Sequence, residues 1–141
     1  MSKLKVAKIE SPDTAVGGIT ISTAGLVTVA AASGSISDIS IAASDTTKTL
    51  DFATSSNFEL TLANTSSCTL ANPSNPSEGQ TCSICIVQDS TGSRLLTYGS
   101  NWEFIGGTAP TLTTTASAVD RIDYVVRTTS KIHAVFTANY S

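Results

Sequence analysis

Residues 72–136 read NPSNPSEGQTCSICIVQDSTGSRLLTYGSNWEFIGGTAPTLTTTASAVDRIDYVVRTTSKIHAVF, and this stretch decides the fold class. Short runs with alternating apolar residues are separated by Asn-Pro, Asp-Ser-Thr-Gly, Gly-Ser-Asn and Gly-Gly. Short strands spaced by such turn residues are typical of a compact antiparallel β domain. The stretch therefore predicts an all-β fold.

The same pattern continues on both sides and predicts eight short strands after residue 45. They are expected near residues 48–52, 58–63, 68–71, 81–88, 94–98, 102–105, 119–127 and 131–139. Eight short strands suit an antiparallel β-sandwich or a jelly roll. The last two form the clearest hairpin, with Ile132, Ala134 and Phe136 on one face of its second strand. Residues 113–119 are the strongest helix candidate, but they lack a 3.6-residue apolar stripe, so little or no helix is expected.

The composition indicates a surface rich in hydroxyl groups and poor in charge. Charged residues make up 13% of the chain, against about 25% in a typical domain. Ser and Thr together outnumber the charged residues by more than two to one. Because charged residues normally protect strand edges from pairing with other chains, their scarcity suggests that copies or partners cover many edges.

Residues 1–44 are predicted to form an attachment arm followed by short strands that are poor in large side chains. Residues 45–141 are predicted to form the β-sandwich module. Apolar residues alternate within residues 1–44 in three pairs that are expected to pack between subunits: Ile19 and Ile21, Val27 and Val29, and Ile39 and Ile41. A flexible linker is the alternative. The arm is expected to bind a partner sheet by strand addition or to be a frayed terminus, and its candidate binding residues are Lys3, Leu4, Lys5, Val6 and Ile9.

The three cysteines do not predict a metal or redox site. Cys82 and Cys85 have the spacing of such sites, but they lie in a predicted strand, where residues three apart point to opposite faces. Cys68 completes no four-ligand set. No metal ligands are therefore expected, and the thiols are expected to be small buried side chains.

Catalytic residues are not predicted either. The single histidine, His133, lies beside Lys131 on the polar face of the last strand, and no Gly-x-Ser-x-Gly pattern occurs. Asp120 and Asp123 are three apart in a strand and face opposite sides. Tyr98, Trp102 and Tyr124 are the candidates for an exposed ligand patch, and core packing is the alternative role for such side chains.

Two classes of partner are disfavoured by charge and hydropathy. The net charge of −3 lacks the basic patch of a nucleic-acid binder. No apolar run reaches the roughly 20 residues that span a bilayer, and the lysine-containing start is not followed by the apolar segment of a signal peptide. Neither nucleic-acid binding nor membrane insertion is expected.

Four pieces of the C-terminal region carry a family resemblance: NPSNPSEGQ, QDSTGSR, YGSNWEFIGGTAPTLT and AVDRIDYVVRTTSKI. In this order they resemble the small β module of tail-fibre-like and head-decoration-like proteins of tailed bacteriophages, especially of the marine podovirus type. The resemblance covers residues 58–140. The opening MSKLKVAKIES is similar to the start of such fibres, in which the leading segment attaches to the particle.

The resemblance implies a non-enzymatic virion structural protein, assembled in the host cytoplasm, that forms a homotrimer and needs no cofactor. It implies attachment to the major capsid protein or to another virion protein. Because relatives often carry extra repeats between arm and module, which this chain lacks, a capsid decoration or cement protein or a short head fibre is expected. The alternatives are a tail-fibre receptor-binding or tail-attached protein, which could bind a host-surface glycan, and a carbohydrate-binding β-sandwich.

Overall fold

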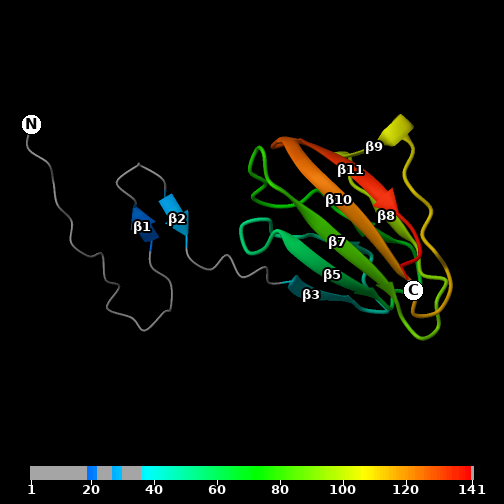
Figure 1. Cartoon of the computed structure of the whole chain (residues 1–141). Helices are drawn as coiled ribbons and strands as arrows, with labels where there is room; N and C mark the ends of the chain where they lie inside the picture. The colour runs from blue at the N-terminus through cyan, green and yellow to red at the C-terminus, as the bar shows by residue number, and fades with distance from the viewer. Residues whose placement is uncertain (1–18, 22–26, 30–35, 141) are drawn as a thin grey trace, which may run out of the picture. The chain divides into compact units, whose positions relative to one another are not determined.

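The computed structural model describes residues 19–21, 27–29 and 36–140 of the chain. The chain divides into two compact units, residues 1–34 and residues 35–141. In the first unit, β1 (Ile19–Ile21) and β2 (Val27–Val29) form an antiparallel pair. The second unit, called the module below, contains all the other described elements (Figure 1).

A sheet of six strands forms one layer of the module. In spatial order its strands are β3 (Ile36–Ile41), β5 (Asn57–Leu62), β7 (Thr81–Gln88), β10 (Val119–Thr128), β11 (Lys131–Thr137) and β9 (Trp102–Phe104). β3, β5 and β7 run parallel to one another, whereas β10 is antiparallel to both β7 and β11. β9 pairs in parallel with β11 and ends the sheet. Apolar residues alternate along these strands because one face of the sheet is buried.

A second sheet contains three short parallel strands, in the order β4 (Thr47–Lys48), β6 (Cys68–Leu70) and β8 (Leu96–Tyr98). The chain passes from the larger sheet to the smaller one and back, so that β3–β4, β5–β6 and β7–β8 form three stacked coils. Backbone hydrogen bonds also join neighbouring coils at the corners, where the chain passes from one sheet to the other. Ala63 N donates to Ile41 O at 2.9 Å, and Asp89 N donates to Leu62 O at 3.1 Å.

The core fills the space between the two sheets. Its fully buried members come from all three coils and from the C-terminal hairpin: Ile41, Leu60, Leu62, Cys68, Leu70, Ile84, Ile122, Val126 and Ile132. Phe52 stacks on Phe58 and Tyr124, with ring centroids 5.8 and 4.8 Å apart. Because these core residues all lie between positions 41 and 134, the module has a core of its own.

The all-β, sandwich-like fold class is confirmed, but the strand pairing differs from the expected antiparallel arrangement. Within the module, only the pairs β7–β10 and β10–β11 are antiparallel. The connection from β3 to β5 contains β4, which lies in the other sheet, so the chain returns in its original direction. The eight predicted strands nevertheless correspond in order to β4 through β11.

The C-terminal hairpin is confirmed in detail. β10 and β11 are antiparallel, with Tyr124 opposite Ala134. Ile132 and Ala134 are buried and Phe136 packs against the core, whereas Lys131 and His133 are exposed on the other face.

The module begins earlier than the predicted boundary at residue 45, because β3 pairs with β5 along its whole length. Residues 113–119 contain no helix, and the described residues have one helical turn, the 3₁₀ turn η1 (Ile105–Gly107). No helix in the described part of the chain is long and apolar enough to span a membrane.

Candidate functional site

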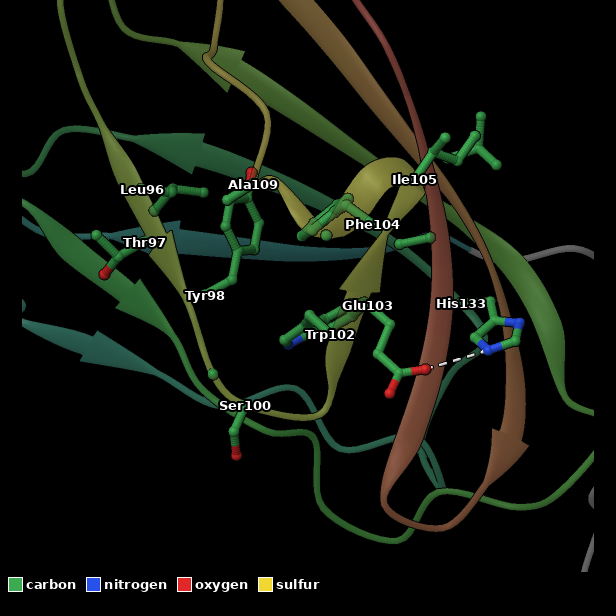
Figure 2. Close-up of a pocket in the computed structure, with 14 residues that line it drawn as sticks. Leu96, Thr97, Tyr98, Ser100, Trp102, Glu103, Phe104, Ile105, Ala109 and His133 are labelled. Atoms are coloured by element: carbon green, nitrogen blue, oxygen red, sulfur yellow. Dashed lines mark ion pairs between the residues drawn. The ribbon is translucent and has the colours of Figure 1, made fainter.

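A groove of about 930 Å³ lies between β8 and β9 of the module. These strands follow each other in the chain but are edge strands of different sheets. β8 forms one side of the groove and β9 the other, and β11 lies beyond β9 (Figure 2). The groove is therefore a lateral opening between the edges of the two layers.

A tight turn at residues 99–101 closes one end of the groove. Gly99 N donates to Leu70 O at 2.9 Å, and Asn101 N donates to Asn72 Oδ1 at 2.8 Å. A Cβ atom at Gly99 would lie 2.7 Å from Asn72 N, so the close approach requires glycine. The Trp102 indole N–H donates to Ala71 O at 3.0 Å and fixes the start of β9.

The walls of the groove are mainly apolar and aromatic. Tyr98 from β8 and Phe104 from β9 meet edge to face, with ring centroids 4.8 Å apart and planes at 68°. Leu96, Trp102 and Ala134 also line the groove. The space thus suits a ligand with apolar groups on the side that enters.

The Tyr98 hydroxyl is buried and has no hydrogen-bond partner in the described part of the chain. Burial raises the pKa of Tyr98, and the negative charge of Asp120 raises it further. Asp120 is itself buried and accepts hydrogen bonds from the backbone N–H groups of Thr113 and Asn139, at 2.7 and 2.9 Å. Tyr98 therefore remains a neutral phenol at physiological pH.

Only two of the three residues of the predicted aromatic patch line the groove. Tyr98 and Trp102 line the groove, although Trp102 is only 6% exposed. Tyr124 is 4% exposed and donates its hydroxyl hydrogen to Ser56 O at 2.6 Å. Tyr124 is thus a core residue and not part of an exposed patch. The alternation in β10 places Tyr124 on the buried face together with Ile122, which is the signal that could have excluded it.

Two titratable side chains, Glu103 and His133, also line the groove, and they contact Arg127 and Lys131, which lie outside its lining. Glu103 forms ion pairs with Lys131 and His133, the latter at 3.1 Å (Figure 2). The hydrogen bond from Lys131 is the main cause that lowers the pKa of Glu103, and the charges of Lys131, Arg127 and His133 add to it. Arg127 Nε donates to His133 Nε2 at 3.0 Å. Because one ring nitrogen cannot accept and donate at the same time, the contacts of His133 Nε2 with Arg127 Nε and with Glu103 exclude each other.

Cys82 and Cys85 face opposite sides of β7 as predicted, but both are half-buried, so that of the three thiols expected to be buried only Cys68 is. Cys82 packs against the core, whereas Cys85 is three residues further along β7 and faces the opposite side. Cys68 is buried, and burial raises the pKa of its thiol. No group of three or more His, Cys, Asp and Glu residues in the described part of the chain could hold a metal ion.

The remaining predicted site residues are placed as follows. The arm residues Lys3, Leu4, Lys5, Val6 and Ile9 lie outside the described residues. Of the six residues predicted to pack between subunits, Ile39 and Ile41 pack against the core of their own module, Ile41 completely buried. The other four belong to the pair β1–β2: Ile19, Ile21, Val27 and Val29.

In the comparison with known proteins, one family model matches the chain. The family model described as "Putative phage tail fibre C-terminal domain" matches residues 42–129, which is more than half of the chain. The matched residues contain β4 through β10, and so most of the stacked coils and the groove. No match was found among curated proteins or among solved structures. The chain therefore belongs to the phage tail fibre C-terminal domain family and is a bacteriophage virion protein.

Proposed function

We propose that the chain is a non-enzymatic structural subunit of a phage tail fibre and that its module is the outward-facing part. The observation that carries this proposal is the family match, which lies within the module and includes two of its three coils. The expected role as a capsid decoration or cement protein has no comparable support.

The architecture suits a mechanical role. Neighbouring coils share backbone hydrogen bonds along their strands and through their corners. Asn64 is buried at one corner and donates from its side-chain amide to Ser66 O and Leu95 O, at 2.7 and 3.0 Å. The second bond joins the second coil to the third. Stacking of this kind buries one continuous core and gives a unit that resists local opening.

The experiment that tests the proposal is a count of copies on purified particles. Mass spectrometry with isotope-labelled standard peptides would measure the ratio of this chain to the major capsid protein and to a tail protein. A fibre subunit is expected in a small, fixed ratio to the tail proteins. A ratio that follows the capsid lattice would contradict the proposal and favour the decoration role.

The arm is proposed to attach the fibre subunit to the particle through Lys3, Leu4, Lys5, Val6 and Ile9. Deletion of residues 1–10 should abolish binding to fibreless particles in a pull-down and leave the unfolding midpoint of the module unchanged, because the core lies between positions 41 and 134. The matched control replaces Lys3 and Lys5 by Arg, which keeps the charge and the alternation. Unaltered attachment after the deletion would refute the role of the arm.

A further inference from the structure

The single histidine of the chain, His133, lies beside the groove between two groups of opposite charge. It is the register partner of Glu103 across the parallel pair β9–β11, and its Nε2 atom lies 3.1 Å from Glu103 Oε2. The same Nε2 atom lies 3.0 Å from Nε of Arg127 on β10. His133 is therefore within hydrogen-bond distance of an anion on the edge strand β9 and of a cation on the interior strand β10.

The protonation state of His133 decides which of these two contacts forms. In the neutral ring, the donor Arg127 favours the tautomer with the proton on Nδ1, because Nε2 can then accept. In the protonated ring both nitrogens donate, so Nε2 bonds to Glu103 and carries a positive charge beside Arg127. Histidine changes its charge between about pH 5 and 8. The two arrangements therefore exchange with each other near neutral pH.

The charged groups around His133 leave Glu103 as the carboxylate that a protonated ring meets. Lys131, on the same strand, forms an ion pair with Glu103, and its hydrogen bond is the main cause that lowers the pKa of Glu103. On β10 the remaining outward-facing charges, Asp123 and Arg121, pair with each other at 2.8 Å. The turn η1, which lies beside β11, contains no charged residue. Glu103 therefore stays ionised over the pH range in which histidine titrates.

The contact with Glu103 acts on a short edge strand. β9 has three residues, pairs among the described strands with β11 alone, and continues into the exposed turn η1. Short segments of this kind open locally at a lower free energy than the interior of a sheet. Because β9 forms one wall of the groove, a bond between His133 and Glu103 holds this wall against β11 (Figure 2).

We propose that His133 is a pH switch that fastens β9 to β11 when it is protonated and leaves Glu103 to Lys131 when it is neutral. The groove wall then opens less often at acid pH than at neutral pH. Since the side chains of His133 and Glu103 are half-exposed, the switch changes the population of the open wall by a factor of about two to five. The proposal concerns the module alone and does not depend on the proposed function.

Hydrogen exchange of the Trp102 indole N–H tests the effect on β9, because this group is bonded to Ala71 O and Trp102 is the single tryptophan. The matched variant is His133→Asn, whose side-chain oxygen can accept from Arg127 but never becomes charged. Comparison at equal pH cancels the intrinsic pH dependence of exchange. The two proteins should exchange at similar rates at about pH 7.5, and the wild type about two- to fivefold more slowly at about pH 5.5. A ratio of rates that does not change with pH would overturn the proposal.

The NMR titration of the His133 ring signal tests the partners, because the chain has one histidine. Glu103→Gln should lower the midpoint pH of this signal by about half a pH unit, since it removes the anion that stabilises the protonated ring. Arg127→Gln should raise the midpoint, since it removes a neighbouring cation. The control is Glu59→Gln on β5, which β7 and β10 separate from β11, and it should leave the midpoint unchanged. A midpoint that Glu103→Gln does not lower, or that Glu59→Gln lowers equally, would also overturn the proposal.

Discussion

Tyr98 and Phe104 meet edge to face at 4.8 Å between ring centroids, and this contact joins the edge strands of two different sheets. The Tyr98 hydroxyl has no partner in the described part of the chain, whereas the Tyr124 hydroxyl donates to Ser56 O. The two tyrosines therefore make a matched pair in which only one hydroxyl is bonded.

Replacing each tyrosine by phenylalanine should separate their contributions. Tyr98→Phe should leave the free energy of unfolding unchanged or raise it by up to about 1 kcal/mol, because a buried unpaired hydroxyl is removed. Tyr124→Phe should lower it by about 1 kcal/mol through the lost hydrogen bond. Urea unfolding followed by tryptophan fluorescence measures both. A larger loss for Tyr98→Phe than for Tyr124→Phe would contradict the assignment.

Gly99→Ala should destabilise the turn between β8 and β9, because the new Cβ would lie 2.7 Å from Asn72 N. We expect a loss of about 1–3 kcal/mol, as in other overpacked sites. Gly106→Ala is the control. Gly106 has a φ of 72° but open space around it, so only the cost of the left-handed backbone, about 1 kcal/mol, is expected. Equal losses of unfolding free energy in thermal scans would refute the steric argument.

Asn64→Ala should cost about 2–3 kcal/mol of unfolding free energy, because it leaves the bonds to Ser66 O and Leu95 O unmade at a buried corner. Thr65→Ala at the same corner removes only an exposed bond to Ala43 O and should cost less than about 1 kcal/mol. Chemical denaturation of the two variants provides the comparison. If Asn64→Ala proves as mild as Thr65→Ala, Asn64 does not hold the coils together.

At acid pH the free energy of unfolding of the module should fall, in part because Asp89 becomes protonated. Hydrogen bonds from Arg94 are the main cause that lowers the pKa of Asp89, and the backbone N–H groups of Gly92 and Thr91 also contribute. Because the folded-state pKa lies below the unfolded value of about 3.9, the stabilisation is present above that pH and is lost as pH falls through the folded-state pKa. Asp89→Asn should therefore reduce the acid-induced fall in the urea midpoint. An unchanged pH profile in that variant would exclude Asp89 as a contributor.

The positions of the strands were predictable because each has its own local signal. Alternation along 81–88 gave β7 its observed bounds, Thr81–Gln88, and the turn residues around it marked the neighbouring strands. The hairpin β10–β11 was also predictable, since a connection of a few residues can join only antiparallel neighbours.

The groove was not predictable as a site. Its two sides come from β8 and β9, and the sequence shows that these strands are adjacent in the chain but not that they are edges of different sheets. Trp102 and Tyr124 looked alike as isolated aromatics, yet one lines the groove and the other is bonded to Ser56 in the core. The alternation in β10 could have placed Tyr124 on the buried face, but only long-range packing shows that Trp102 borders the groove.

The sequence by itself determined an all-β chain, the order of its strands and the buried face of the final strand, because these depend on neighbours within a few residues. The tertiary structure decided that β3, β5 and β7 are parallel and that β8 borders the groove. A period of two is the same in parallel and antiparallel strands, so the pairing depends on contacts between residues far apart in the chain.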